Sequence, residues 1–201
     1  MAMLKTPITP RDHIKGDPDA PVILVEYGDY QCPYCAMAQP VVRELLRSFS
    51  TDLALVFRHF PLTEVHPMAA PAAQAAEFAG AHDAFWGMHE ALFANQPQLS
   101  MPLIFGIAGA LGLSQTELQE ALTAGTYLQK VRDDFMGGVR SGVNGTPCFF
   151  INGLRYDGAR SFGDLAAAIA AVRPIPPPPA RPAPTQRPPM GGATSPKGLV
   201  P

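Results

Sequence analysis

The stretch Gln31-Cys32-Pro33-Tyr34-Cys35 carries two cysteines with two residues between them, at the junction of an apolar run and a segment of helical spacing. The apolar run, Val22-Ile23-Leu24-Val25, has the composition of a buried strand. A cysteine pair in this context is typical of thiol–disulfide sites. At the first turn of a helix, exposed N–H groups and the positive end of the dipole stabilise a thiolate, the form that attacks disulfides. We therefore expect Cys32 to be an exposed nucleophile of low pKa, and Cys35 to close a bond with it.

Three other kinds of site use such a cysteine pair. A structural zinc site needs two more thiolate or imidazole ligands, and the remaining candidates, Cys148, His59 and His66, are isolated along the chain. A static disulfide that closes so short a ring removes little entropy from the unfolded chain. An iron–sulfur cluster would need ligands from elsewhere. Redox exchange is therefore the favoured interpretation, with no metal and no organic cofactor.

Composition narrows the class of protein. The chain has 201 residues, 47% of them hydrophobic, which is enough for one domain with an insertion. A net charge of −2 gives no basic surface, so nucleic acid is not an expected partner. No apolar run reaches the ~18 residues of a membrane span. Residues 1–21 lack the features of a secretion signal. We expect a cytoplasmic protein, or a periplasmic or extracellular one if a signal peptide was removed.

The domain organisation follows from changes in composition. Residues 1–20 are polar, contain several prolines and are interpreted as an N-terminal extension. Residues 21–173 form the domain, in which about 63–138 carry only helical patterns and indicate an inserted helical subdomain. Residues 174–201 contain 11 prolines and almost no large apolar side chains. Such a tail cannot offset the entropy of ordering, so we expect disorder there.

Local patterns predict the elements around the motif. The segment after Cys35 has helical spacing, with Pro40 expected to kink it. Ser114 and Ser161 each have the spacing of a helix N-cap with an acid three residues on. Asn152-Gly153 is a hairpin signal. Strands are predicted at residues 22–27, 53–60, 148–151 and 154–156.

Two polar residues in the predicted strands have two interpretations each. Glu26 is either an exposed carboxylate at a strand end or a partly buried acid that moves protons to and from Cys35, because burial raises a carboxyl pKa. His59 is either a satisfied polar group or a cation that lies near the site and favours the thiolate.

The order of these elements resembles the DsbA-like form of the thioredoxin fold, over residues 21–172. Three motifs carry the resemblance, and each stands in the expected order: Glu26-Tyr27-Gly28-Asp29-Tyr30 leading into the cysteine motif, Phe57-Arg58-His59-Phe60-Pro61-Leu62, and Gly142-Val143-Asn144-Gly145-Thr146-Pro147 followed by Phe149-Phe150-Ile151-Asn152-Gly153. The resemblance implies an α/β, thioredoxin-like fold with an inserted all-helical subdomain.

The resemblance also assigns roles to residues of the motifs. It implies that Thr146-Pro147 is a cis peptide beside Cys32, and that the Thr146 main chain pairs with an extended substrate segment. Pro33 and Tyr34 are expected to contact substrate as well. Glu26 aligns with the acid that lies beneath the active-site disulfide in this family.

Two departures from the family matter. Cys148 stands where the family commonly has a non-thiol residue, so it is either a third sulfur near the site or a small buried hydrophobe. The dipeptide Pro33-Tyr34 is the one found in glutaredoxins, whereas DsbA proteins carry Pro-His. The reduction potential of DsbA is about −120 mV and that of glutaredoxins about −200 to −230 mV. We therefore predict a less oxidising couple than that of DsbA.

These observations predict a thiol–disulfide oxidoreductase that acts on protein thiols and disulfides. Cys32 would attack, Cys35 would resolve the mixed disulfide, and Glu26 would handle the Cys35 proton. The alternatives are a glutathione-linked, glutaredoxin-like exchanger and a non-catalytic interaction module that uses the Pro-rich tail. Glutathione or a thioredoxin-type protein is the expected redox partner.

Overall fold

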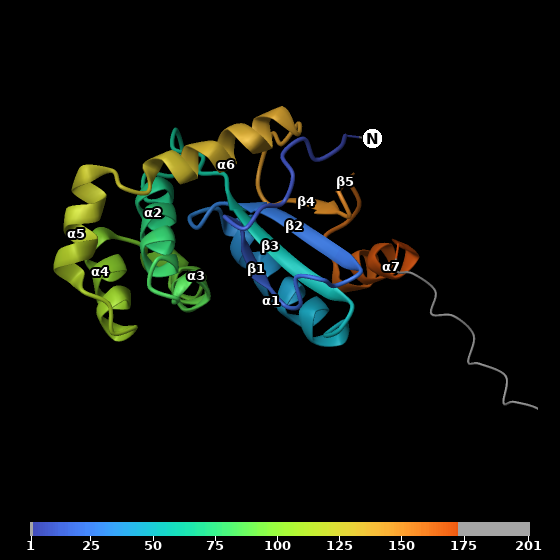
Figure 1. Cartoon of the computed structure of the whole chain (residues 1–201), viewed down its shortest axis with the longest axis horizontal. Helices are drawn as coiled ribbons and strands as arrows, with labels where there is room; N and C mark the ends of the chain where they lie inside the picture. Colours follow the sequence, from blue (N-terminus) through green and yellow to red (C-terminus); the bar gives the residue numbers. More distant parts are fainter. Residues whose placement is uncertain (1, 173–201) are drawn as a thin grey trace, which may run out of the picture.

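The fold is built on a five-stranded mixed sheet of strand order β1-β3-β2-β4-β5, seen in the computed structural model of Figure 1, which describes residues 2–172. β2 (Val22–Gly28) and β3 (Leu53–His59) pair in parallel at the centre. β1 (His13–Lys15), β4 (Cys148–Ile151) and β5 (Leu154–Tyr156) run antiparallel to their neighbours. Residues 174–201, for which we expected disorder, lie outside the described residues.

The two faces of the sheet are covered by different helices. α1 (Pro33–Ser48) and α7 (Phe162–Val172) pack on the face that carries Leu24, Leu55 and Phe149. On the other face, a cluster that includes Val25, Val56 and Phe150 packs against α6 (Leu128–Arg140). Successive strand residues point to opposite faces, so a continuous apolar run fills both. The predicted mixed α/β architecture is confirmed.

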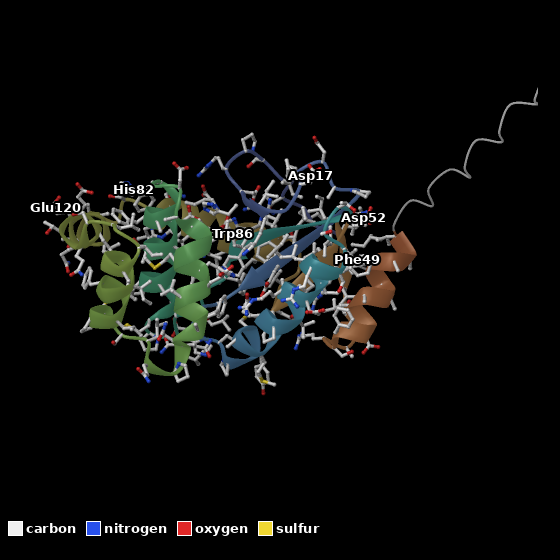
Figure 2. All side chains as sticks on the ribbon, turned by 90° about the horizontal axis from the view of Figure 1, so that it is seen from below. Asp17, Phe49, Asp52, His82, Trp86 and Glu120 are labelled. Atoms are coloured by element: carbon white, nitrogen blue, oxygen red, sulfur yellow. The ribbon has the colours of Figure 1, made fainter. Side chains whose placement is uncertain are left out.

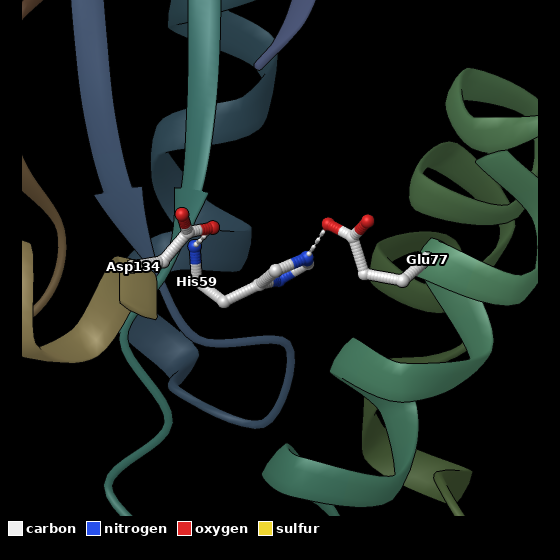
Figure 3. A group of neighbouring side chains, drawn as sticks. All are labelled: His59, Glu77 and Asp134. Carbon is white, nitrogen blue, oxygen red and sulfur yellow. Dashed lines mark hydrogen bonds and ion pairs between the residues drawn. The ribbon is translucent and has the colours of Figure 1, made fainter. Parts of the chain in front are cut away.

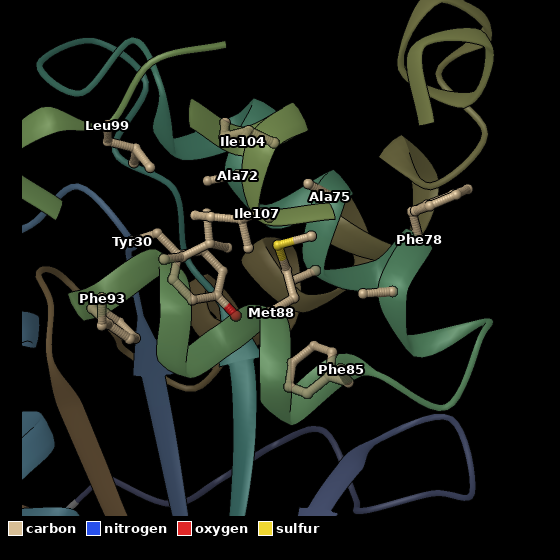
Figure 4. Close-up of a cluster of buried hydrophobic side chains, with 14 of the residues drawn as sticks. Tyr30, Ala72, Ala75, Phe78, Phe85, Met88, Phe93, Leu99, Ile104 and Ile107 are labelled. Atoms are coloured by element: carbon tan, nitrogen blue, oxygen red, sulfur yellow. The ribbon is translucent and has the colours of Figure 1, made fainter. Parts of the chain in front are cut away.

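The inserted part is helical, as the resemblance implied. α2 (Ala69–Gly80), α3 (Phe85–Ala94), α4 (Met101–Ala110), α5 (Gln115–Ala124) and α6 lie between β3 and β4 in the sequence. Their alanine-rich and aromatic faces meet in one buried cluster, shown in Figure 4. Tyr30 and both cysteines of the motif belong to the same cluster. The insertion therefore shares its core with the redox motif. Trp86 on α3, labelled in Figure 2, also joins the insertion to the sheet. Its indole N–H donates to the Ile14 carbonyl of β1 at 3.3 Å.

The N-terminal segment is part of the sheet. No sequence pattern predicts a strand before residue 22, yet β1 pairs with β3. Arg58, fully buried on β3, explains the attachment. Its guanidinium donates to both carboxylate oxygens of Asp12, at 2.7 and 3.0 Å, and to the carbonyls of Thr6 and Pro7. A three-residue strand without an apolar run gives no local signal.

The turn and cap predictions are confirmed. Ser114 Oγ accepts from the Glu117 N–H, and Ser161 Oγ from the Asp164 N–H, both at 3.2 Å. Asn152 and Gly153 adopt positive φ in the β4–β5 turn. α1 continues through Pro40 to Ser48. Among residues 2–172, none of the helices has the length and apolar character that crossing a membrane requires.

Candidate active site

Cys32 stands immediately before α1, at its N-cap position. Pro33 occupies the first turn, where a missing N–H costs nothing. The helix then buries Ala38, Val42 and Leu45 against the sheet, and this fixes its N-terminus beside the end of β2. The predicted start of the helix is confirmed.

The side chain of Cys32 is covered, which corrects the expectation that it is exposed. Only 4% of the residue is accessible. Its Sγ lies 3.4 Å from the carbonyl oxygen of Thr146, and Gln96 in the insertion donates to the Cys32 carbonyl at 2.8 Å. The loop before β4 and the insertion thus enclose the motif from two sides. Tyr34, by contrast, is 63% exposed.

The two thiols have opposite electrostatic environments. The hydrogen bond from Cys35, supported by backbone N–H groups of Tyr34 and Cys35, lowers the pKa of Cys32 to about 5. Burial, followed by the hydrogen bond to Cys32 and the charge of Glu26, raises the pKa of Cys35 far above its usual value. The reduced pair is therefore a Cys32 thiolate beside a Cys35 thiol.

The loop that leads into the motif is held by Asp29, a residue that sequence analysis did not single out. Its Oδ1 accepts from the Gln31 N–H at 2.7 Å. Its Oδ2 accepts from the Leu62 N–H at 2.8 Å and contacts His66 Nδ1 at 2.7 Å. The Asp29 N–H points at Cys35 Sγ, 3.4 Å away. These hydrogen bonds hold the loop in place. The only sequence signal for them is an acidic residue three positions before the first cysteine.

Glu26 is fully buried beneath the motif, so the interpretation as a buried acid is confirmed and the exposed one is wrong. It lies on the central strand, paired with Phe57 of β3 and Phe149 of β4. Burial raises the pKa of Glu26 to about 8. Gln39 Nε2 donates to its Oε1 at 3.4 Å, whereas Oε2 has no hydrogen-bond partner among the described residues.

The Thr146–Pro147 peptide bond is cis. It lies in the loop before β4, and the contact between the Thr146 carbonyl and Cys32 puts that loop beside the motif. Thr146 Oγ1 is buried without a partner among the described residues. Thr146 and Pro147 also line a cavity of about 170 Å³. The two residues expected to receive substrate backbone are therefore next to the nucleophile.

Cys148 is a buried hydrophobe on the other face of the sheet. It is 6% exposed and packs with Tyr27 and Phe150, in the cluster that α6 covers. Cys35 belongs to the buried cluster of the helical insertion. Cys148 pairs with Tyr27 of β2, whereas Glu26 pairs with the next residue, Phe149, so Cys148 and Glu26 point to opposite faces of the sheet. All three cysteines are free thiols.

His59 belongs to a buried ion-pair network, not to the cysteine site (Figure 3). Its Nε2 lies 2.8 Å from Glu77 Oε1, and its backbone N–H donates to Asp134 at 3.1 Å. His59, Glu77 and Asp134 have the residue types of metal ligands and lie close together. However, the Lys130 ammonium lies 2.7 Å from Asp134 and 3.5 Å from Glu77, so a cation already neutralises the carboxylates. The network joins β3 to α2 and α6 of the insertion.

Comparison with known proteins places this geometry among related folds. A family model described as thioredoxin matches residues 8–171. BdbD from Bacillus subtilis, in its oxidised crystal structure, has a TM-score of 0.77 at 24% identity, covering 85% of this chain and 97% of BdbD. A thioredoxin-like oxidoreductase from Silicibacter pomeroyi has a TM-score of 0.71 at 26% identity, covering 81% and 92%. The thioredoxin-like fold in its DsbA-like form is confirmed.

The curated proteins that are similar to this chain in sequence are named as antiporters. Na(+)/H(+) antiporter NhaA 1 from Salinispora arenicola is 45% identical over 170 residues, and NhaA 3 from Salinispora tropica is 42% identical over 170 residues. Each match covers 84% of this chain and 26% of the relative. The chain therefore spans about a quarter of the length of these relatives.

Proposed function

The chain belongs to the thioredoxin family, and from this we propose that it is a thiol–disulfide oxidoreductase that exchanges disulfides with proteins through Cys32 and Cys35. The observation that carries the proposal is the pair of thiols at the start of α1, whose pKa values are shifted in opposite directions. The pKa of Cys32 is lowered, and that of Cys35, which is buried above Glu26, is raised. The name of the Silicibacter pomeroyi neighbour, a thioredoxin-like oxidoreductase, supports the same class of reaction.

The reaction runs through a mixed disulfide. The Cys32 thiolate attacks a substrate disulfide, forms a Cys32–substrate bond and releases one substrate thiolate. Cys35 then loses its proton to the Glu26 carboxylate, and its sulfur attacks Cys32 Sγ. The Cys32–Cys35 disulfide forms and the second substrate thiolate leaves. In the opposite direction, a substrate thiolate attacks the Cys32–Cys35 disulfide, and protonated Glu26 returns its proton to the departing Cys35 sulfur.

The substrate is proposed to be an extended protein segment. In the structure the Thr146 carbonyl faces Cys32 Sγ across 3.4 Å, so a segment whose cysteine reaches Cys32 lies along the same loop. Extended segments bind to main-chain groups through hydrogen bonds of the strand type. Exposed Pro33 and Tyr34 supply the neighbouring contact surface.

A glutathione-linked exchanger is the second candidate, favoured by the Pro33-Tyr34 dipeptide. In that case the mixed disulfide on Cys32 would carry glutathione instead of a protein. The insertion argues for the larger partner, because Gln96 and the cluster around Tyr30 pack directly on the motif. Turnover of glutathionylated peptides, compared with disulfide-bonded proteins, separates the two candidates.

The antiport named for the curated relatives is not proposed for this domain. Those proteins share only about a quarter of their length with it. We propose that the shared quarter supplies redox chemistry in those proteins.

We also propose the cytoplasm as the site of action, with an exported form as the alternative. Acid trapping and alkylation of cysteines in intact cells would show Cys32 mostly reduced in the first case and mostly oxidised in the second.

Trapping the mixed disulfide tests the function. Cys35→Ser should retain the attacking thiolate and accumulate a covalent complex with a disulfide-bonded substrate, which mass spectrometry of the intact chain detects. Cys32→Ser should form no complex and lose exchange activity. Cys148→Ser is the matched control and should behave as wild type, because its sulfur lies on the other sheet face. Exchange that persists in Cys32→Ser would contradict the proposal. Binding of a partner that depends on residues 174–201 alone would instead support the interaction module.

A further inference from the structure

Three hydrogen bonds connect the buried Glu26 carboxylate to side chains of α1, α3 and the loop before α1. Gln39 Nε2 lies 3.4 Å from Glu26 Oε1. Gln39 Oε1 lies 3.2 Å from His89 Nε2, and His89 Nδ1 lies 3.1 Å from the Tyr30 hydroxyl. The reaction described above uses Glu26 but assigns nothing to the other members.

The direction of the chain follows from which atoms can donate. An amide oxygen only accepts, so His89 Nε2 carries the hydrogen in the bond to Gln39. Nδ1 of the neutral imidazole then accepts, so the Tyr30 hydroxyl donates to it. Every bond therefore donates toward Glu26 Oε1. Burial, reinforced by the charges of His59, Lys15 and His13, holds the pKa of His89 well below its usual value, consistent with the neutral ring.

We propose that Gln39 is a positioning residue for proton transfer at Cys35: it holds Glu26 by Oε1 and leaves the unpartnered Oε2 to exchange the proton. The inference rests on the proposed function. Proton transfer needs a donor and an acceptor in reach of each other, and a carboxylate that turned on its axis would present either oxygen. The Gln39 bond fixes which oxygen is occupied. The proton then moves from Cys35 Sγ to Glu26 Oε2 as Cys35 attacks Cys32, and back in reverse.

His89 is what keeps Gln39 in place. Gln39 is half-buried and borders a cavity of about 280 Å³ between α1, α3 and β1. Its amide would otherwise have room to leave Glu26. His89 lines the same cavity and holds the amide oxygen. The aromatic rings of Phe57, Phe93 and Trp86 in turn pack on the imidazole.

Several charged or titratable groups lie near the hydrogen-bond chain that runs from Tyr30 to Glu26, and they come from each of the elements packed around it. Cys35 and Tyr30 interact with the charge of Glu26. His13 and Lys15 on β1 and His59 on β3 act on His89. The rim of the cavity carries three further groups, Arg43, Arg47 and Glu90. A pH profile therefore needs a variant that changes Gln39 alone and leaves these charges in place.

Gln39→Leu removes the amide without adding charge. Because the Gln39 bond stabilises the Glu26 carboxylate, its loss should raise the Glu26 titration midpoint, by about one pH unit for one hydrogen bond to a charged group. The midpoint is read from the ¹³C shift of the Glu26 carboxyl in the reduced protein, with Glu26→Gln for assignment. His89→Phe should shift it in the same direction. Gln74→Leu, at a buried glutamine of α2, is the matched control and should leave it unchanged.

A kinetic readout accompanies the titration. Thionitrobenzoate is attached to Cys32 as a mixed disulfide, and its release reports the attack of Cys35. At pH 7, Gln39→Leu should release it several-fold more slowly, and the difference should vanish above both midpoints. A midpoint in Gln39→Leu equal to that of wild type would overturn the inference, and so would a Gln74→Leu shift of the same size. If Gln39→Leu does not fold, His89→Phe decides in the same way. Failure of wild type to release thionitrobenzoate would instead refute the proposed function, while the carboxyl titration still tests Gln39.

Discussion

The Sγ of Cys32 lies 3.4 Å from the carbonyl oxygen of Thr146, although 114 positions separate the two residues in the chain. The inserted helices lie within this interval. Strand β4 returns beside β2, and the turn before β4 therefore meets the helix start after β2. The nucleophile and the loop proposed to receive substrate are thus fixed relative to each other by the central sheet. Predictions about the thiolate can be tested without knowledge of the substrate.

The first prediction concerns the Cys32 thiolate. Absorbance at 240 nm should show it with a midpoint near pH 5, the pKa expected of Cys32. Cys35→Ala should move the midpoint upward, because it removes the largest stabilising hydrogen bond. Cys148→Ala, on the opposite sheet face, should leave it unchanged. A midpoint above pH 7 in the wild-type protein would contradict the assigned environment.

The second prediction is a loss of stability with rising pH caused by Glu26. Its pKa is about 8 in the folded protein, against an ordinary value of 4.5 when the side chain is in water, as in the unfolded chain. The unfolded chain releases the proton first, so Glu26 should contribute a fall of about 5 kcal/mol in the free energy of unfolding between about pH 4.5 and pH 8. Cys32 contributes a rise over an overlapping range, because its pKa is about 5 in the folded protein against an ordinary value of 9.0. Urea denaturation of Cys32→Ser across this range measures the Glu26 contribution, because this variant lacks the opposing thiol.

In the Cys32→Ser background, Glu26→Gln should abolish that slope and leave the protein more stable at pH 8 than Cys32→Ser alone. Exposed Glu64 provides the control, since Glu64→Gln in the same background should keep the slope of Cys32→Ser. If wild type and Glu26→Gln show the same pH dependence, Glu26 does not titrate as assigned.

The sequence made the local features of the fold predictable. The apolar run before Cys32, the capped helices at Ser114 and Ser161, and the turn at Asn152-Gly153 each depend on residues close in the chain. Burial of Glu26 was one of two interpretations that the sequence left open, and its position on the central strand decides between them. These patterns, together with the resemblance, were sufficient for the fold class and for the order of the elements.

Contacts between distant segments could not be predicted in this way. β1 is short and has no apolar run, and its position depends on pairing with β3. The chain from Tyr30 through His89 to Gln39 joins helices that are far apart in sequence. The cover over Cys32 comes from Gln96 and Thr146. Each of these contacts joins residues that are distant in the chain, and no local sequence pattern identifies such partners.

The third prediction tests the attachment of the N-terminal segment. Asp12→Ala removes the carboxylate that pairs with the buried Arg58 guanidinium. An unpaired buried charge costs about 3–5 kcal/mol, so the unfolding midpoint in urea should fall markedly. The control is Asp133→Ala, which breaks an exposed pair with Arg11 and should change the free energy of unfolding by about 0–1 kcal/mol. Equal effects of the two changes would show that Arg58 does not depend on Asp12.

The last prediction is the reduction potential of the cysteine pair. A more acidic attacking thiol stabilises the reduced state and makes the disulfide more oxidising. DsbA combines a cysteine pKa of about 3.5 with about −120 mV, and thioredoxin a pKa of about 7 with about −270 mV. With the pKa of Cys32 near 5, the Cys32–Cys35 couple should lie between these values. Equilibration against glutathione buffers, with mass spectrometry of alkylated protein, measures it.

Tyr34 offers a way to change that potential in a chosen direction. Its side chain is 63% exposed beside Cys32, so Tyr34→His should be tolerated and should place a partly charged imidazole near the thiolate. The potential should then rise by tens of millivolts, since about 30 mV corresponds to about 1.4 kcal/mol of stabilisation. Met37→His adds the same group one turn further along α1, at a position 71% exposed, and should have a smaller effect because it is farther from Cys32. A potential that is unchanged or lowered in Tyr34→His would mean that the dipeptide between the cysteines does not set the reduction potential of the couple.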